Sequence, residues 1–143
     1  MTPMEQAVER FEDQGRLVAL VLRHNADLGA GVHFLTPGEL TQQLAYMDNP
    51  AGRVIPPHMH NPAPRRVEQT GEVLMIRSGR LLVELFRSDK SPLAQVVLGP
   101  GDLILLCGSP HGFKVLERCQ MIEVKQGPYL GADEKMFLFP ENK

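Results

Sequence analysis

Short apolar runs separated by turn-forming residues dominate this chain from residue 17 onward. Twelve prolines and thirteen glycines are spread over 143 residues without a repeat, which supplies tight turns at short intervals. Many short strands with turn signals between them are typical of a sandwich or a barrel, and not of alternating strands and helices. We therefore predict an all-β fold, with strands over residues 17–23, 32–35, 42–47, 52–56, 72–78, 80–87, 94–98, 102–107, 112–117, 119–125 and 136–139.

The first fifteen residues have a different pattern, which predicts a short amphipathic helix. Thr2 is a candidate helix cap, Pro3 suits the first helical position, and Glu5 completes a capping box. Apolar residues then recur at helical spacing until Gly15, namely Met4, Ala7, Val8 and Phe11. We expect this helix to cover one end of a barrel or to lie across a partner subunit.

Length and charge narrow the class of protein. A chain of 143 residues is the size of one domain with a single core. A formal charge of -2 gives no electrostatic reason to expect nucleic acid or an anionic membrane as a partner. The sequence has neither a membrane-spanning apolar run nor the basic start of a signal peptide, so we expect a cytoplasmic protein.

Three histidines and one glutamate form the strongest candidate site. His58 and His60 are two residues apart, so on an extended strand both imidazoles leave the same face. Glu72 opens the next apolar run, and His111 follows the run over 102–107. Three imidazoles and one carboxylate suit iron, manganese, nickel or zinc, so we predict one divalent transition metal.

The segment around the paired histidines resembles the first signature of the cupin superfamily. That signature reads Gly, five residues, His-x-His, a short gap, Glu, six residues, Gly. Five residues separate Gly52 from His58, and six residues separate Glu72 from Gly79, both as in the family. The gap between His60 and Glu72 holds eleven residues, whereas three or four are usual in the family.

A second stretch resembles the second cupin signature, which reads Gly, five residues, Pro-x-Gly, two residues, His, three residues, Asn. The turn over residues 100–102 and His111 match it, with His111 one residue early. Cys107 and Ser109 replace the inner Pro and Gly, and Val115 stands where Asn is common. The two signatures together cover roughly residues 32 to 126.

The resemblance implies a fold, a ligand set and an assembly. The fold is a double-stranded β-helix, or jelly-roll barrel, in one domain over residues 1–143: a short helix over 1–15, the barrel over 16–126 and a C-terminal extension over 127–143. The implied metal ligands are His58, His60, Glu72 and His111, with Glu68 as the substitute for Glu72 if the gap folds differently. Similar cupins commonly pair through their outer sheet and N-terminal segment, so a homodimer is expected.

Residues 61–70 form a proline-rich insertion directly after the paired histidines, so we expect this loop to hang over the site. Arg65 and Arg66 in it are candidates for binding an anionic substrate, because guanidinium groups bind carboxylate and phosphate through two prongs. The alternative is a solvated barrel rim. Glu123 and Lys125 share a strand face, either as a surface ion pair or as an acid and base that point into the barrel.

Three classes of function fit these residues. The first is a metal-dependent enzyme of the oxygenase, isomerase or lyase type that acts on a small anionic molecule, such as a sugar nucleotide or an organic acid. The metal would act as a Lewis acid or bind oxygen. The second is a non-catalytic module that binds or senses a small molecule. The third is a metal-independent sugar epimerase or isomerase, which needs a histidine base and a tyrosine acid, and the chain offers only Tyr46 and Tyr129.

Overall fold

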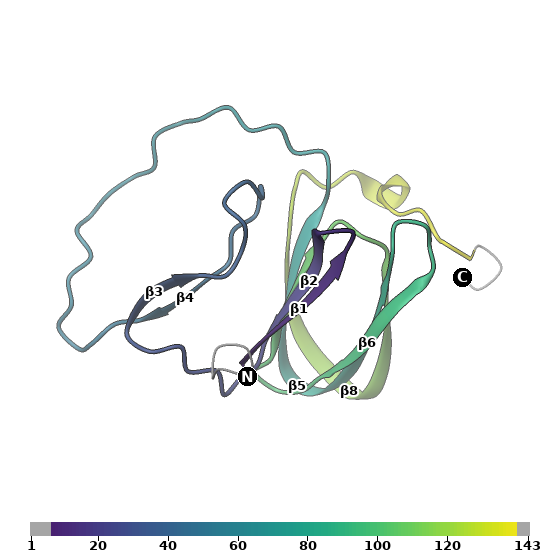
Figure 1. Cartoon of the computed structure of the whole chain (residues 1–143), viewed down its shortest axis with the longest axis horizontal. Helices are drawn as coiled ribbons and strands as arrows, with labels where there is room; N and C mark the ends of the chain where they lie inside the picture. The colour runs from purple at the N-terminus through teal and green to yellow at the C-terminus, as the bar shows by residue number, and fades with distance from the viewer. Residues whose placement is uncertain (1–6, 140–143) are drawn as a thin grey trace.

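The protein is built almost entirely from antiparallel strands. The computed structural model describes residues 7–139. A strongly curled sheet forms a half-barrel, and a separate two-stranded hairpin lies beside it (Figure 1). The strands are β1 (Val8–Asp13), β2 (Arg16–Leu22), β3 (Gly31–Phe34), β4 (Ala45–Asp48), β5 (Gly71–Phe86), β6 (Pro92–Leu98), β7 (Leu103–Cys107) and β8 (His111–Lys125), followed by one 3-10 turn, Gly131–Glu134.

The predicted all-β class is confirmed, whereas a closed double-stranded β-helix stays a prediction. Within the described residues, no helix has the length and apolar character needed to cross a membrane.

The long strand β5 organises the curled sheet. Its first half pairs with β7, its second half with β6, and nearly its whole length with β8. The resulting strand order is β1-β2-β7-β5-β6, with β8 paired to β5 outside this path. A sixteen-residue strand that serves two neighbours on one side must bend between them, because two-sided pairing and strand twist accumulate along it. This bend produces the half-barrel.

Two breaks between predicted strands are absent. At each break one continuous strand runs through, and its pairing register is irregular there. The predicted separation of the strands over 72–78 and 80–87 is wrong, because β5 runs through Gly79. The runs 112–117 and 119–125 likewise form the single strand β8. The register between β5 and β8 shifts three times between Ile76 and Leu81, so the extra residues are taken up as bulges. Gly79 keeps a positive φ of 84° at this point.

The predicted N-terminal helix is wrong for the residues that the structure describes. Val8 to Asp13 form strand β1, which pairs with β2, and Val8 is buried. Gln14 and Gly15 both have positive φ, 52° and 76°, as a two-residue hairpin turn of type I′ requires. Gly15 therefore turns a hairpin and does not end a helix. The proposed cap at Thr2 to Glu5 lies outside the described residues.

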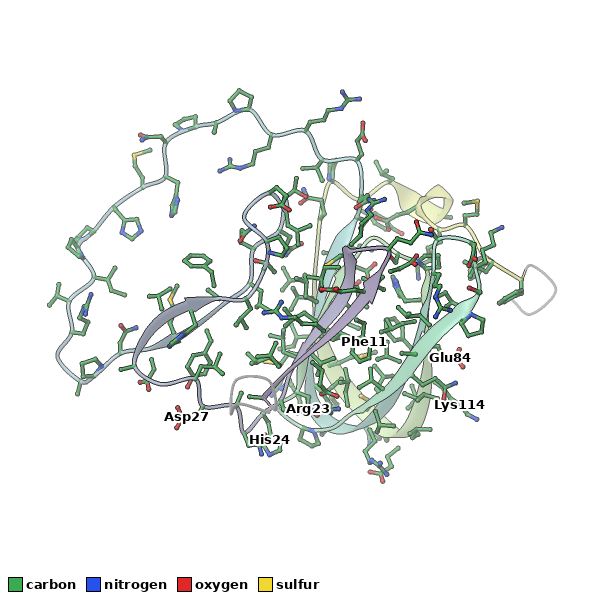
Figure 2. All side chains as sticks on the ribbon, in the orientation of Figure 1. Phe11, Arg23, His24, Asp27, Glu84 and Lys114 are labelled. Carbon is green, nitrogen blue, oxygen red and sulfur yellow. The ribbon has the colours of Figure 1, made fainter. Side chains whose placement is uncertain are left out.

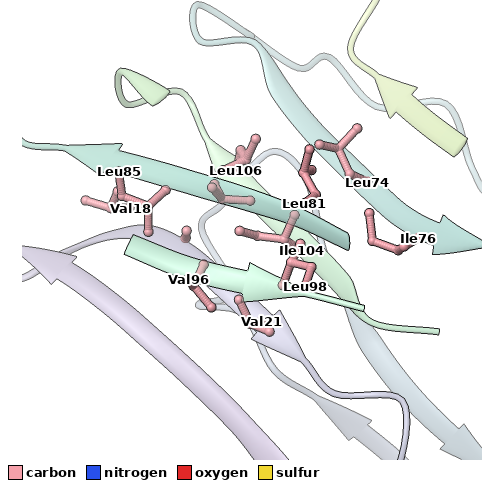
Figure 3. Packing of buried hydrophobic residues seen from close by; sticks show 12 residues of the cluster. Val18, Val21, Leu74, Ile76, Leu81, Leu85, Val96, Leu98, Ile104 and Leu106 are labelled. Atoms are coloured by element: carbon pink, nitrogen blue, oxygen red, sulfur yellow. The ribbon is translucent and has the colours of Figure 1, made fainter. Parts of the chain in front are cut away.

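The main core lies on the inner face of the half-barrel. Side chains alternate along β5 as expected for a strand, and Leu74 and Ile76 point inward and are almost completely buried. After the bulges, the alternate residues Leu81, Val83 and Leu85 continue this face. Figure 3 shows them packed against Val18, Val21, Val96, Leu98, Ile104 and Leu106 from the neighbouring strands.

A second apolar cluster anchors the hairpin to the outer face of the sheet. Leu35 follows β3 and Tyr46 lies on β4, and both belong to the cluster that contains Leu20 of β2 and Leu105 of β7. Residues 49–70 then leave the hairpin in a wide arc that returns to the sheet at the start of β5 (Figure 1). The predicted strands over 52–56 and 136–139 are absent.

A buried carboxylate ties the strand ends together at one end of the sheet. Asp102, just before β7, accepts hydrogen bonds from the backbone N–H groups of His24 and Gly99, both at 2.8 Å. The guanidinium of Arg23 lies 3.1 Å from the same carboxylate and also contacts Glu9. Figure 2 labels Arg23 and His24 at the end of β2. The predicted turn over residues 100–102 is therefore held by its own acidic side chain.

Candidate functional site

Glu72 and His111, which come from opposite ends of the β5/β8 pair, meet inside the half-barrel. In the strand register His111 stands opposite Leu85, thirteen residues along β5 from Glu72. The curl of β5 brings these ends together, so that His111 Nε2 lies 3.4 Å from Glu72 Oε2. Both side chains are largely buried, with 22% and 15% of their surface exposed. The structure thus joins two of the four predicted metal ligands.

The local backbone sets the orientation of the His111 ring. Its Nδ1 lies 2.9 Å from the carbonyl oxygen of Ser109, which can only accept a hydrogen bond, so Nδ1 carries the proton. The second nitrogen, Nε2, is then directed at Glu72. His58 is held in the same way, with Nδ1 at 2.8 Å from the Pro56 carbonyl. Metal-binding histidines commonly donate one ring N–H to a carbonyl and leave the other nitrogen for the metal.

The two side chains at this site favour opposite charges. The hydrogen bond with His111 lowers the pKa of Glu72 against the effect of burial, and the charges of Lys125 and Lys135 lower it further. Burial by itself would lower the pKa of His111, but Glu72 and the Ser109 carbonyl outweigh it, so the pKa is raised. The pair therefore favours a carboxylate on Glu72 beside a protonated imidazole on His111.

A lysine and the C-terminal segment complete the polar surroundings. Lys125 stands opposite Glu72 in the register and shares its inward face. Its Nζ lies 2.9 Å from Glu134 Oε2 in the 3-10 turn and 5.7 Å from the centre of the Tyr129 ring. Lys125 lies on the inward face, as one of its two predicted roles requires, but it forms an ion pair with Glu134 and not with Glu123, and an acid-base role stays a prediction. Strand alternation indicates Lys125, whereas no local pattern indicates Glu134.

The paired histidines lie elsewhere. His58 and His60 are exposed in the arc over residues 49–70, with ring centroids 5.5 Å apart. Within residues 7–139 no three His, Cys, Asp or Glu side chains gather closely enough to hold a metal ion. The structure therefore places the four predicted ligands in two separate pairs, Glu72 with His111 inside the half-barrel and His58 with His60 on the arc.

The structure also separates the two candidate carboxylates. Glu68 is exposed on the arc and pairs with Arg66 at 2.7 Å, whereas Glu72 faces His111. The eleven-residue gap is thus part of an excursion that ends where β5 begins, as the choice of Glu72 requires. Arg65 and Arg66 are both exposed on the same arc.

Comparisons with known proteins add no family assignment. The chain matches no protein-family model, no curated protein and no solved structure.

Proposed function

We propose that the protein binds one divalent transition metal through Glu72 and His111 together with His58 and His60. The observation that carries this proposal is the buried pair of His111 Nε2 and Glu72 Oε2, with Nδ1 already bonded to a carbonyl. A metal ion needs deprotonated ligands that already point toward it. If a metal ion takes the place of the proton on Nε2, His111 supplies one nitrogen ligand and Glu72 supplies one carboxylate ligand. The arc supplies the two further imidazoles.

The bound metal would bind a small anionic molecule or act on it. A three-nitrogen, one-oxygen set suits iron, manganese, nickel or zinc, and such an ion acts as a Lewis acid on a substrate oxygen. Lys125 on the inward face, and Arg65 and Arg66 on the arc, supply positive charge for a phosphate or carboxylate. A cupin-type jelly roll completed by the arc is the fold that fits this site.

Metal content tests the ligand set directly. We expect about one metal ion per chain in the wild-type protein, and at least about a 10-fold loss of affinity in His111→Ala and Glu72→Gln, since each removes a ligand from a shared ion. His58→Ala and His60→Ala should behave alike. Elemental analysis and competition with a chelator measure this.

Two matched variants control the metal experiment. Glu68→Gln alters the exposed carboxylate of the arc, and His33→Ala removes a histidine that lies against Tyr46 and near the carbonyls of Gly29 and Ala30, away from the proposed ligands. Both should keep wild-type metal content. Equal loss in Glu68→Gln and Glu72→Gln, or none in His111→Ala, would contradict the proposed ligands.

The arc arginines test the ligand class. Replacing Arg65 and Arg66 by alanine should leave metal content intact and weaken an anionic ligand by about 1–3 kcal/mol, the scale of a charge-assisted hydrogen bond. Calorimetric titration of both forms with sugar nucleotides and organic acids measures the difference. An anion that binds both forms with equal affinity would show that these arginines do not select it.

A metal-independent acid-base site is the second candidate. A histidine whose ring is fixed by one hydrogen bond and faces a carboxylate resembles the base in an epimerase or isomerase. Tyr129 stands beside Lys125 in the same region and is the tyrosine that such a reaction would use. If metal-free protein keeps full epimerase or isomerase activity, and Tyr129→Phe abolishes that activity, the metal-independent function is favoured over the metal-dependent one.

A further inference from the structure

Among the residues that the structure describes, strand β8 has a free edge along its whole length. Its fifteen residues hydrogen-bond to β5 on one side, and within residues 7–139 no strand pairs with the other side. Nearly all of its residues are exposed or half-buried on both faces. A long free edge of this kind exposes a row of unpaired N–H and C=O groups, which is the usual template for adding another strand.

The side of β8 that faces into the half-barrel is apolar but uncovered. Phe113, Val115 and Met121 stand opposite the buried core residues Val83, Leu81 and Ile76 in the register, so they share the core face. They nevertheless expose 41%, 57% and 40% of their surface. The core is thus open along β8, where a further strand would close it.

The arc over residues 49–70 has the properties of that missing strand. It is extended, and within the described residues the backbone N–H groups of its non-proline residues between 54 and 70 make no hydrogen bond. Val54, Ile55 and Met59 on it expose 74%, 59% and 81% of their surface. Figure 2 shows its side chains standing clear of the half-barrel.

We infer that the arc of each chain adds to the free edge of β8 in a second copy, so that two chains exchange arcs in a two-fold dimer. This inference rests on the proposed metal site and deepens it. His58 and His60 of one copy would meet Glu72 and His111 of the other, so that each site takes ligands from two chains. Two half-sites that stay apart in one chain become complete in the dimer.

The β3/β4 hairpin favours an arc that pairs with β8 of a second copy over an arc that pairs with β8 of its own chain. Val32, Phe34 and Met47 share the uncovered face of the β3/β4 hairpin, because Val32 pairs with Met47, and they expose 53%, 67% and 57% of their surface. A second uncovered apolar surface, formed by Met75, Ile122 and Val124, lies on the outer face of β5 and β8.

The order of the chain connects these two surfaces. The hairpin ends at Asp48, immediately before the arc. In the exchanged dimer the hairpin, which directly precedes the arc, would lie beside β8 of the second copy, where its uncovered face would meet the uncovered face of that strand. Closure within one chain would leave that face of the hairpin exposed, because only the opposite face packs on the chain's own sheet. Uncovered apolar surfaces commonly mark interfaces between proteins.

Cross-linking tests the exchange without any metal. In a Cys107→Ala, Cys119→Ala background, Met59→Cys is placed in one protein and Lys114→Cys in another. Met59 alternates away from the two histidines, and Lys114 lies on the outer face of β8, labelled in Figure 2. After unfolding and refolding the mixture, a short bis-maleimide should produce a covalent dimer. Arg16→Cys in place of Lys114→Cys is the control, and its yield should be several-fold lower.

The chain carrying both Met59→Cys and Lys114→Cys decides between the two arrangements. Exchange predicts covalent dimers on a denaturing gel, and light scattering of the wild-type protein should give the mass of two chains. An internally cross-linked monomer, a yield equal to the Arg16→Cys control, or a monomeric wild-type protein would overturn the exchange.

Complementation then links the exchange to the metal site. The double variant His58→Ala/His60→Ala and the double variant Glu72→Gln/His111→Ala should each lose metal alone. Refolded together, mixed dimers hold one intact site, so random pairing should restore about one quarter of wild-type metal content. No restoration, with wild-type metal binding intact, overturns the exchange. Absence of metal from the wild type together with intermolecular cross-links instead rejects the metal site and retains the exchange.

Discussion

Gly79→Ala is expected to destabilise the protein by more than about 4 kcal/mol, enough to prevent folding of a marginally stable domain. Gly79 has a φ of 84°, a conformation in which an L-residue is strained by about 1–2 kcal/mol. A Cβ at this position would also lie 2.0 Å from the carbonyl oxygen of Arg118. Backbone cannot move aside as a side chain can, so the β5/β8 pairing would have to separate. Circular dichroism and chemical denaturation measure the effect.

Gly15→Ala provides the matched control. Gly15 has a similar φ of 76°, but a Cβ there would have no atom within 4 Å. The control should cost only the conformational strain, about 1–2 kcal/mol. Similar stability of the two variants would show that close approach of β8 at Gly79 does not constrain the fold.

Asp102→Ala is expected to destabilise the protein by about 2–4 kcal/mol. The carboxylate is nearly buried and accepts the N–H groups of His24 and Gly99, while it pairs with Arg23. Removing it leaves two backbone donors and one guanidinium without that acceptor. Contact between Arg23 and Glu9 persists, so the cost stays below that of a fully stranded buried charge. Urea denaturation at neutral pH measures the loss.

The same carboxylate predicts a dependence on pH. Burial raises the pKa of Asp102, but the N–H groups of Gly99 and His24 and the Arg23 guanidinium lower it by more, so the folded-state pKa lies below its ordinary value near 3.8. Its contribution is therefore complete above about pH 4 and is lost as the pH falls through the folded-state pKa. Asp102→Asn should show less loss of stability below pH 4 than the wild type. Equal acid sensitivity would mean that other carboxylates dominate.

The sequence was most informative where a pattern is local. Alternation along a strand depends only on neighbouring residues, so the inward placement of Leu74 and Ile76 with Glu72 could be predicted without a structure. The N-terminal helix failed for the converse reason. Apolar residues at helical spacing are also compatible with a strand, and pairing of β1 with β2 through the Gln14–Gly15 turn decided between them.

The sequence alone determined the all-β class from residue 17 onward, the facing of side chains along β5 and the residue types of a candidate metal site. Tertiary structure alone decided which of those residues meet. Glu72 and His111 are thirty-nine residues apart in the chain, and only the bend of β5, generated by its two-sided pairing and bulges, brings their side chains to 3.4 Å. The spacing of His58 and His60 predicts a shared face but not a location, because it carries no information on where the arc lies relative to the sheet.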